Sequence, residues 1–502
     1  MKSKRILMNI VITILLQMVV FLSGFIIKNL VVVTYGSVVN GMFGSIDQII
    51  TSLSVLEAGI GSATVVSLYR PLVEKDHDGI NRIMNTANFY YKRTGLLYSL
   101  VLFVISFIYP RLIADQFDVL TMQLLIFIMA AATLLDYFFY AKYRIMLEAD
   151  QRNYVLSSVQ ILTTLLSTLL TIGLIFLRWN FVLIKVVVGL MAVLKLVLVL
   201  SYVRRTYPFV KIRYSKRELV KLHQRGATFV HQICGIIVNN TDLLIITMAL
   251  PKDSLKEASV YGIYYMIAAA LLTVIHTITT VFTAGFGHLL VTATKERIKA
   301  VFQEFELLSF IVVFVVYSCL AILYLPFIGI YTKNFTDAIY YRPQFAYLFV
   351  GIGLMQTIRI PGVTVIAAAG HFKETMWRAV VEFSLNLIVS LLLVQWLGVI
   401  GVLIGTLLSF LYRSTDIIIY NAKKLIPGTL GLTVWRIVKN TMAAVLFVGI
   451  MLYFRPAITG YGQWILYAIS VGAAAVAVFG AINLATDPSA QMVLKRLKRM
   501  ID

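Results

Sequence analysis

The sequence predicts an all-α integral membrane protein of about fourteen transmembrane helices, with two six-helix lobes around a central cavity and two extra C-terminal helices. Of the 502 residues, 60% are hydrophobic and 13% are charged, about half the charged share of a soluble domain. The apolar residues form stretches that each reach the roughly 20 residues needed to cross a bilayer. Backbone groups in lipid must pair within their own segment, so each stretch is expected to be a helix.

The first six spans form an N-lobe at residues 1–203. They are expected at 7–34, 41–69, 86–109, 119–141, 154–177 and 180–203. The strongly basic segment 204–225 follows, with Pro208 near its start, and it predicts a cytoplasmic linker that joins the two lobes.

The next six spans form a C-lobe at residues 226–420. They are expected at 227–250, 260–291, 302–325, 343–369, 378–397 and 398–420, with one short turn at Leu397 and Gly398. Segments 39–43 and 260–264 resemble each other, which favours two parallel repeats of six spans. Two further spans, 438–455 and 463–485, lie within 421–486 and precede a cytoplasmic tail at 487–502.

The distribution of lysines and arginines along the sequence indicates how the chain is oriented in the membrane. Most of the 44 Lys and Arg, which give a net charge of +21, fall in segments on one side of the predicted membrane. The positive-inside rule therefore places both termini in the cytoplasm, and it explains the charge through anionic lipid without nucleic acid.

Catalytic and metal motifs are weak in this sequence. There is no GxxxxGK[ST] motif to cradle phosphates. The two cysteines, Cys234 and Cys319, lie in apolar spans and predict neither a disulfide framework nor a metal site. The short motif Asp76-His77-Asp78 is interpreted as a helix start with Asp78 as the N-cap. We therefore expect no cofactor, no metal and no enzymatic activity.

Charged residues within spans are the candidate functional groups, because each costs roughly 2.5–3.5 kcal/mol at mid-membrane. Lys28 and Arg359 are expected to line the cavity and to bind an anionic headgroup, with Pro361 breaking the helix beside Arg359. Asp47, Glu57 and Asp242 are expected to pair with these cations or to couple transport to ions or protons. The alternative is that all five form structural ion pairs between packed helices.

A second set of polar residues is expected near the same cavity. It consists of Asn239, Asn240, Lys195, Glu382 and Asn386. Hydrogen bonds between neighbouring helices explain such residues equally well. Lys185 lies close to a predicted membrane edge and is expected to extend its ammonium to the interface.

Six short segments carry a family resemblance. They are 35–43, Leu56-Glu57-Ala58-Gly59-Ile60-Gly61-Ser62-Ala63, 68–72, 240–246, 368–374 and 397–406. In their order and spacing they resemble the polysaccharide-repeat flippases of the multidrug/oligosaccharidyl-lipid/polysaccharide exporter superfamily. The last two spans resemble the pair that lipid-flipping members of this superfamily carry and its drug exporters lack.

The resemblance implies transport without a cofactor. The expected cargo is an oligosaccharide on undecaprenyl pyrophosphate, moved by alternating access to the outer leaflet of the bacterial inner membrane for capsule or exopolysaccharide synthesis. Membrane lipids, a polysaccharide polymerase and glycosyltransferases are the partners it implies. Three alternatives remain: a flippase for the peptidoglycan precursor lipid II, a cation-coupled multidrug exporter, and a membrane glycosyltransferase or polymerase.

Overall fold

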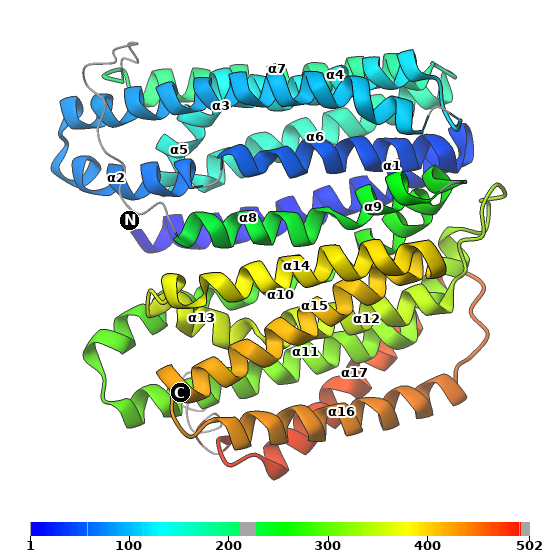
Figure 1. Ribbon diagram of the computed structural model, residues 1–502. Coiled ribbons are helices and arrows are strands. Elements are labelled where there is room, and N and C mark those ends of the chain that lie inside the picture. The colour runs from blue at the N-terminus through cyan, green and yellow to red at the C-terminus, as the bar shows by residue number, and fades with distance from the viewer. Residues whose placement is uncertain are drawn as a thin grey trace. The chain divides into compact units, whose positions relative to one another are not determined.

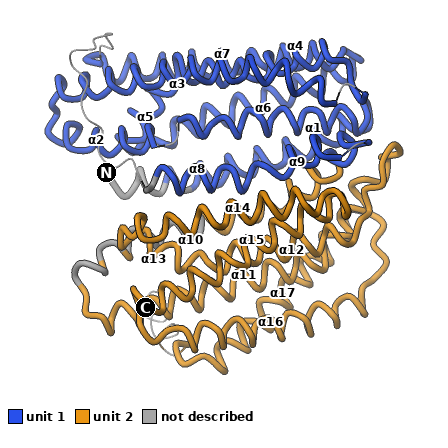
Figure 2. The backbone as a smooth tube through the Cα atoms, viewed as in Figure 1, with its two compact units in different colours: residues 1–259 blue, residues 260–502 orange. Residues whose placement is uncertain are grey.

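The computed structural model describes residues 2–57, 59–113, 115–210, 227–250, 252–490 and 492. Over these ranges it contains helices and no strand, which confirms the predicted all-α class. The chain forms two compact units, unit 1 (Met1–Ser259) and unit 2 (Val260–Asp502) (Figure 2). The helices of span 227–250 therefore group with unit 1, and the six-plus-six division of the lobes stays a prediction.

Unit 1 is a bundle of long helices (Figure 1). In chain order they are α1 (Lys2–Ser52), η1 (Leu53–Glu57), α2 (Ile60–Glu74), α3 (His77–Leu112), α4 (Val119–Leu135), the π-helical turn η2 (Asp136–Tyr140), α5 (Ala141–Ala149), α6 (Asn153–Phe176), α7 (Phe181–Thr206), α8 (Ala227–Asn240) and α9 (Asp242–Ala249). Most of the predicted linker, 211–225, lies outside the described residues, and α7 continues to Thr206.

Helix α1 contains the first predicted span and the beginning of the second. Its 51 residues would form a straight rod of about 76 Å, more than twice the thickness of the hydrocarbon core. Gly36 has non-helical dihedral angles (φ 86°, ψ 168°) that favour glycine, so the chain turns there. The first half of α1 packs along α6, where Asn9 Nδ2 donates to Gln151 O (3.0 Å) and Tyr35 Oη donates to Trp179 O (2.5 Å).

The second predicted span, 41–69, is not one continuous helix. Helix α1 ends at Ser52, the 3₁₀ turn η1 follows, and α2 begins after Gly59. A similar break separates α8 from α9, whose axes differ by 49°. Both breaks lie beside polar residues of the candidate site.

The Asp76-His77-Asp78 motif starts a helix, but its N-cap is Asp76. Asp76 has an extended backbone, and its Oδ1 accepts from the backbone N–H of Gly79 at 2.9 Å. Asp78 lies in the first turn of α3, where a negative charge is favoured by the helix dipole. The prediction of Asp78 as the cap was wrong because the helix begins at His77, two residues earlier than a cap at Asp78 would place it.

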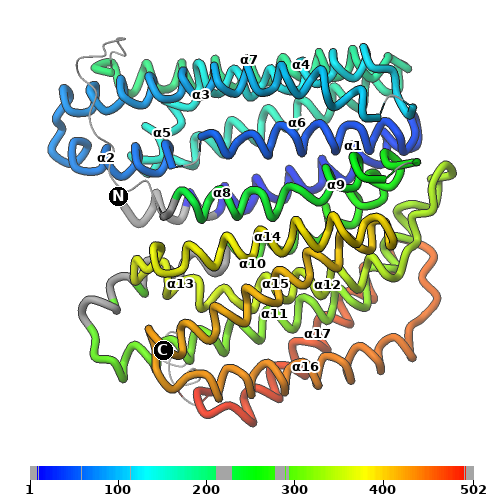
Figure 3. The backbone as a smooth tube through the Cα atoms, viewed as in Figure 1, coloured from blue at the N-terminus to red at the C-terminus, as the bar shows by residue number. Residues whose placement is uncertain are grey.

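Unit 2 contains the remaining helices. They are α10 (Ser254–Thr292), which begins in unit 1, α11 (Lys295–Tyr331), α12 (Pro343–Ile358), α13 (Ile360–Ala368), α14 (Phe372–Leu397), α15 (Val399–Tyr420), the π-helical turn η4 (Asn421–Leu425), α16 (Leu430–Tyr453) and α17 (Tyr461–Thr486). The turn between α14 and α15 is the single residue Gly398 (φ 57°), as the sequence predicts. Figure 3 shows the orange and red helices α16 and α17 alongside α11, with which both are in contact.

The helices account for the predicted membrane spans. Twelve helices of the described chain are long and apolar enough to cross a membrane, and the bent pair α8–α9 makes thirteen. Helix α1, in which the chain turns at Gly36, is counted once here, so the count comes close to the predicted fourteen. Large apolar side chains are widely exposed, for example Leu169 on α6 and Val445 on α16. Such an apolar exterior requires lipid, so the chain is a multi-pass membrane protein.

Candidate functional site

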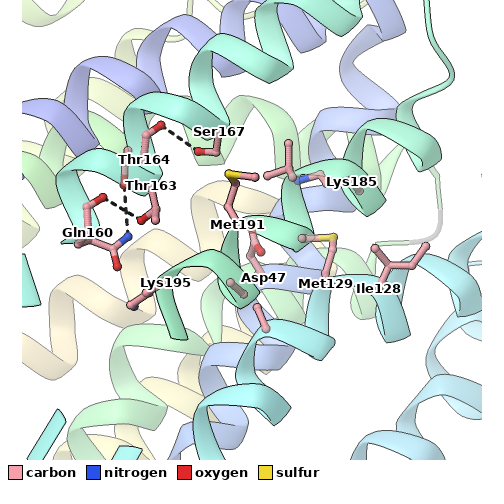
Figure 4. Close-up of a pocket in the computed structure, with 14 residues that line it drawn as sticks. Asp47, Ile128, Met129, Gln160, Thr163, Thr164, Ser167, Lys185, Met191 and Lys195 are labelled. Atoms are coloured by element: carbon pink, nitrogen blue, oxygen red, sulfur yellow. Dashed lines mark hydrogen bonds between the residues drawn. The ribbon is translucent and has the colours of Figure 1, made fainter. Parts of the chain in front are cut away.

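A polar pocket lies inside unit 1 among α1, α4, α6 and α7 (Figure 4). Its volume is about 300 Å³. Helix α6 presents Gln160, Thr163, Thr164 and Ser167 to it, at the i, i+3, i+4, i+7 spacing of one helix face. The opposite face of α6 carries exposed leucines such as Leu162 and Leu169. Helix α6 is therefore oriented with apolar residues toward lipid and hydroxyl and amide groups toward the pocket.

Three charged side chains line this unit 1 pocket. Asp47 comes from α1, and Lys185 and Lys195 come from α7. Within the described chain, the Asp47 carboxylate has neither an ion pair within 4 Å nor a hydrogen bond, although Lys28 and Lys185 act on it electrostatically. Lys185 Nζ lies 3.9 Å from the centroid of the Phe43 ring. An exposed, unpaired carboxylate at this depth requires water or a polar ligand in the pocket.

A second polar pocket of about 330 Å³ adjoins the first, and both are lined by Ala132, Ala192 and Lys195. It contains Asp136 and Arg144. Arg144 Nη2 lies 3.0 Å from Glu57 Oε1 and 3.8 Å from Asp136 Oδ2. The π-helical turn η2 places Asp136 on this side of the bundle, and such turns recur at functional sites. Together the two pockets form one continuous polar region within unit 1.

Unit 2 contains a connected cluster of ions, here called the arginine cluster. Its members are Arg359, Arg378, Glu382, Arg413 and Asp416. Glu382 pairs with Arg359 and also lies 3.4 Å from Arg413 Nε. Asp416 accepts from Arg413 Nη1 at 3.0 Å and pairs with Arg378 Nη1 at 2.9 Å. Three guanidinium groups face two carboxylates, so the cluster carries one surplus positive charge.

The break between α12 and α13 positions Arg359. Pro361 lies at the start of α13 and cannot donate a backbone hydrogen bond, so the span is interrupted at Arg359, as predicted. Asn421 Nδ2 donates to Gly362 O at 3.2 Å, which satisfies a carbonyl near the break. The Arg359 guanidinium stacks over the Phe410 ring at 4.8 Å. Its direction is thereby fixed by packing as well as by Glu382.

The predicted site residues fall into several environments. Lys28 is half-buried on α1 and acts electrostatically on Asp47, whereas Glu57 is paired with Arg144. Asp242 is buried at the first turn of α9, beside the break from α8. Lys195 lines both unit 1 pockets.

The predicted amides take part in helix packing. Asn240 Oδ1 accepts from Gln48 Nε2 at 2.6 Å, which joins α8 to α1. Asn239 Nδ2 donates to Gly235 O within its own helix at 2.7 Å. Asn386 Nδ2 donates to Thr406 Oγ1 at 2.9 Å, which joins α14 to α15. The contacts of Asn240 and Asn386 match the alternative of hydrogen bonds between helices, whereas Asn239 donates within its own helix.

Sequence reasoning missed several charged residues of these sites. They are Asp136, Arg144, Arg378, Arg413 and Asp416. Arg413 and Asp416 are spaced i, i+3 on one helix, a pattern that places both side chains on one face. Two opposite charges at this spacing within an apolar span could have identified Arg413 and Asp416 from the sequence.

A third group of ions, the buried ion network, was also missed. It consists of Glu306 on α11, Arg436 and Lys439 on α16, and Asp487 after α17. Arg436 Nη1 lies 2.8 Å from Glu306 Oε2, and its Nε lies 2.7 Å from Asp487 Oδ2. The Arg436 side chain is 0% exposed. Burial alone would raise the pKa of Asp487, but hydrogen bonds from Arg436 and the Ser489 N–H, with the charges of Arg436 and Lys439, lower it.

The fold is shared with solved membrane transporters. Lipid II flippase MurJ in an inward closed conformation matches with a TM-score of 0.67 and 14% identity, covering 94% of this chain and 99% of that one. An inward-facing multidrug resistance MATE family transporter of the MOP superfamily matches with a TM-score of 0.63 and 12% identity. The match covers 86% of this chain and 98% of that one. An outward-facing MATE family transporter matches with a TM-score of 0.54 and 11% identity, covering 86% of this chain and 96% of that one.

No protein-family model and no curated protein sequence matches the chain. At this identity the structural matches establish the fold, which is that of the MATE and MurJ transporters of the MOP superfamily. These neighbours are transporters and flippases, in agreement with the expectation that the chain is not an enzyme.

Proposed function

We propose that the protein is a flippase that moves an oligosaccharide linked to undecaprenyl pyrophosphate across the bacterial inner membrane for surface polysaccharide synthesis. The observation that carries this proposal is the surplus positive charge of the arginine cluster in the membrane region of unit 2. Pyrophosphate is an anion whose oxygens match the planar, two-pronged donors of arginine. Glycosyltransferases that build the cargo and a polymerase that consumes it are the partners this function requires.

The arginine cluster suits transient binding of an anion. Its exposure rises from Arg413, which is 7% exposed, to Arg378, which is 34% exposed, so it can be reached from one side. A phosphate that replaces a carboxylate at one guanidinium exchanges one anion for another and leaves no charge unpaired. Binding is therefore strong enough to hold the headgroup and reversible enough to release it.

Movement of the cargo would follow alternating access. The fold is known in inward-facing and outward-facing conformations in MATE transporters. In this proposal the polar headgroup passes the charged residues while the polyprenyl chain stays in lipid, with both termini of the protein in the cytoplasm. Lys28 and Lys185 in unit 1 supply further positive charge, and Asp47, Glu57 and Asp242 are the proposed coupling or gating residues.

A lipid II flippase is the second candidate. The match to MurJ covers 94% of this chain, whereas the match to the inward-facing MATE structure covers 86%. The part that the MATE match leaves uncovered is about as long as the segment from α16 to the C-terminus. This difference favours a lipid carrier over a drug as cargo. A cation-coupled drug exporter would also be expected to have an acidic binding region, in contrast to the surplus arginine here.

The test is a flipping assay in proteoliposomes. A fluorescent lipid-linked oligosaccharide and fluorescent lipid II are compared as cargo, and a membrane-impermeant quencher reports their transfer between leaflets. We expect wild-type protein to move the oligosaccharide lipid and Arg359→Gln to slow it at least tenfold. Lys373→Gln, which removes an exposed lysine on α14, is the matched control and is expected to behave as wild type.

Transfer of lipid II alone would assign the protein to the second candidate. Export of a cationic dye without transfer of either lipid would reject both. Equal rates for Arg359→Gln and wild type would remove the arginine cluster from the mechanism.

A further inference from the structure

A cavity of about 420 Å³, here called the loop pocket, lies at the end of unit 2 opposite the end of α17. Its walls are the last turns of α11, the loop after it, and the loop between α16 and α17. The lining residues are Leu325, Pro326, Gly329, Ile330, Lys333, Tyr341, Arg455, Pro456, Ala457, Ile458 and Thr459. Its volume is in the range of known ligand sites.

Two cations line the loop pocket without a protein partner. Among the described residues, the side chains of Lys333 and Arg455 make no ion pair and no hydrogen bond. Both are exposed. The positive-inside pattern leaves few lysines and arginines at this end of the helices, so two converging on one pocket need a specific reason. An anion at the pocket rim supplies that reason.

The remainder of the pocket fits an amphiphile. Leu325, Pro326 and Ile330 line it from α11, and Ala457 and Ile458 line it from the opposite loop. Exposed tyrosines accompany both walls: Tyr341 lines the pocket and is 49% exposed, and Tyr453, two residues before Arg455, is 83% exposed. Exposed tyrosines at helix ends mark the level of lipid headgroups. The pocket therefore combines apolar walls, interfacial aromatics and two cations at headgroup depth.

We propose that the loop pocket binds the phosphate of a membrane lipid, with Lys333 and Arg455 holding the phosphate and the apolar wall holding the first part of the chain. A phosphate at the interface accepts from both cations, and each such cation strengthens the attraction to an anionic lipid headgroup. The chemistry is shared by a phospholipid and by a polyprenyl phosphate. This inference stands apart from the cargo proposed above.

A hydrogen bond joins two of the helices that end or begin at the pocket. Trp464 Nε1 donates to Leu323 O at 3.2 Å and joins α17 to α11 near the pocket. This contact fixes the start of α17, next to the α16–α17 loop, against α11, which lowers the ordering cost of binding a lipid.

The test measures lipid affinity of the purified full-length protein by native mass spectrometry. The probes are phosphatidylglycerol, undecaprenyl phosphate and the phosphate-free lipid dioleoylglycerol. We expect Lys333→Gln and Arg455→Gln each to weaken binding of phosphate-bearing lipid roughly fivefold, and the double variant roughly thirtyfold. Lys252→Gln, an exposed lysine of unit 1, is the control and should bind all three lipids as wild type does.

A second variant tests the apolar part. A Cβ added at Gly329 meets no atom within 4 Å, so Gly329→Leu fills the pocket without disturbing the helix. It should weaken binding of dioleoylglycerol as well as that of the phosphate lipids. The Lys333 and Arg455 variants distinguish the two lipid sources. If they weaken binding of undecaprenyl phosphate alone, the site belongs to the polyprenyl carrier; if they weaken binding of both phosphate lipids equally, it belongs to phospholipid. Unchanged phosphate-lipid affinity in the double variant would overturn the proposal.

Discussion

The arginine cluster and the buried ion network are both built from arginines and carboxylates of unit 2, yet their surroundings differ. In the buried ion network Arg436 is 0% exposed, and two carboxylates face one arginine and one lysine, so the charges balance. In the arginine cluster Arg378 is 34% exposed and a positive charge is left over. A balanced, enclosed network joins helices, whereas an unbalanced network open to one side is suited to bind a mobile anion.

The largest expected effect comes from opening the buried ion network. Arg436→Met leaves Glu306 and Asp487 enclosed without their main cation, and breaking a buried pair in this way costs about 3–5 kcal/mol. We expect a strong fall in thermal stability, measured on detergent-purified protein. Lys373→Met removes an exposed cation and should leave the melting temperature unchanged. An unaltered melting temperature for Arg436→Met would show that this network does not join α16 and α17 to α11.

Asp487→Asn should lower the stability by about 1.5–3 kcal/mol, less than Arg436→Met does. The amide keeps the size of the side chain and loses only the charged hydrogen bonds. The pKa of Asp487 is lowered in the folded protein, so its stabilisation is present above the unfolded value of 3.8 and is lost as pH falls through the folded value. The stability difference between wild type and variant should be constant from about pH 5 to 8 and shrink in stronger acid. A difference that varies between pH 5 and 8 would contradict this assignment.

Arg413→Met should lower the free energy of unfolding less than Arg436→Met does, and its main effect should be on transport. Glu382 keeps Arg359 and Asp416 keeps Arg378, so no carboxylate loses its last partner. We expect a cost of about 0.5–1.5 kcal/mol, much less than for Arg436→Met. The surplus charge disappears, and flipping of a pyrophosphate lipid in proteoliposomes should fall at least tenfold. A stability loss as large as that of Arg436→Met, with normal flipping by the folded fraction, would reverse the roles of the two groups.

The contrast also shows what the sequence could predict. Hydropathy is a local property, so the spans and the turn at Gly398 followed from it, and Pro361 predicted the break beside Arg359. Pairing of charges depends on how each helix is rotated, which hydropathy does not report. Arg436 lay outside the predicted span 438–455, because α16 begins earlier, at Leu430. It was therefore never counted among the intramembrane charges.

The same limit applies to the candidate residues. Glu57 and Asp47 were treated alike on sequence, since both are acidic residues of one predicted span. In the structure Glu57 has Arg144 at 3.0 Å, whereas Asp47 has no ion-pair partner in the described chain and faces a pocket. The break at Gly59 and the π-helical turn η2 bring Glu57 and Arg144 together, and neither distortion follows from apolar periodicity.

Asp47→Asn is expected to have the smallest effect on stability, under about 0.5 kcal/mol, because an exposed carboxylate without a partner has no pair to lose. Its effect should appear in transport. If Asp47 couples cargo movement to protons, the variant should flip cargo at a rate that no longer responds to a pH gradient, while wild type does. Asp253→Asn, which changes an exposed aspartate in a loop of unit 1, is the matched control. A variant that is destabilised by several kcal/mol would show that Asp47 belongs with the structural ions, and a full gradient response would show that coupling runs elsewhere.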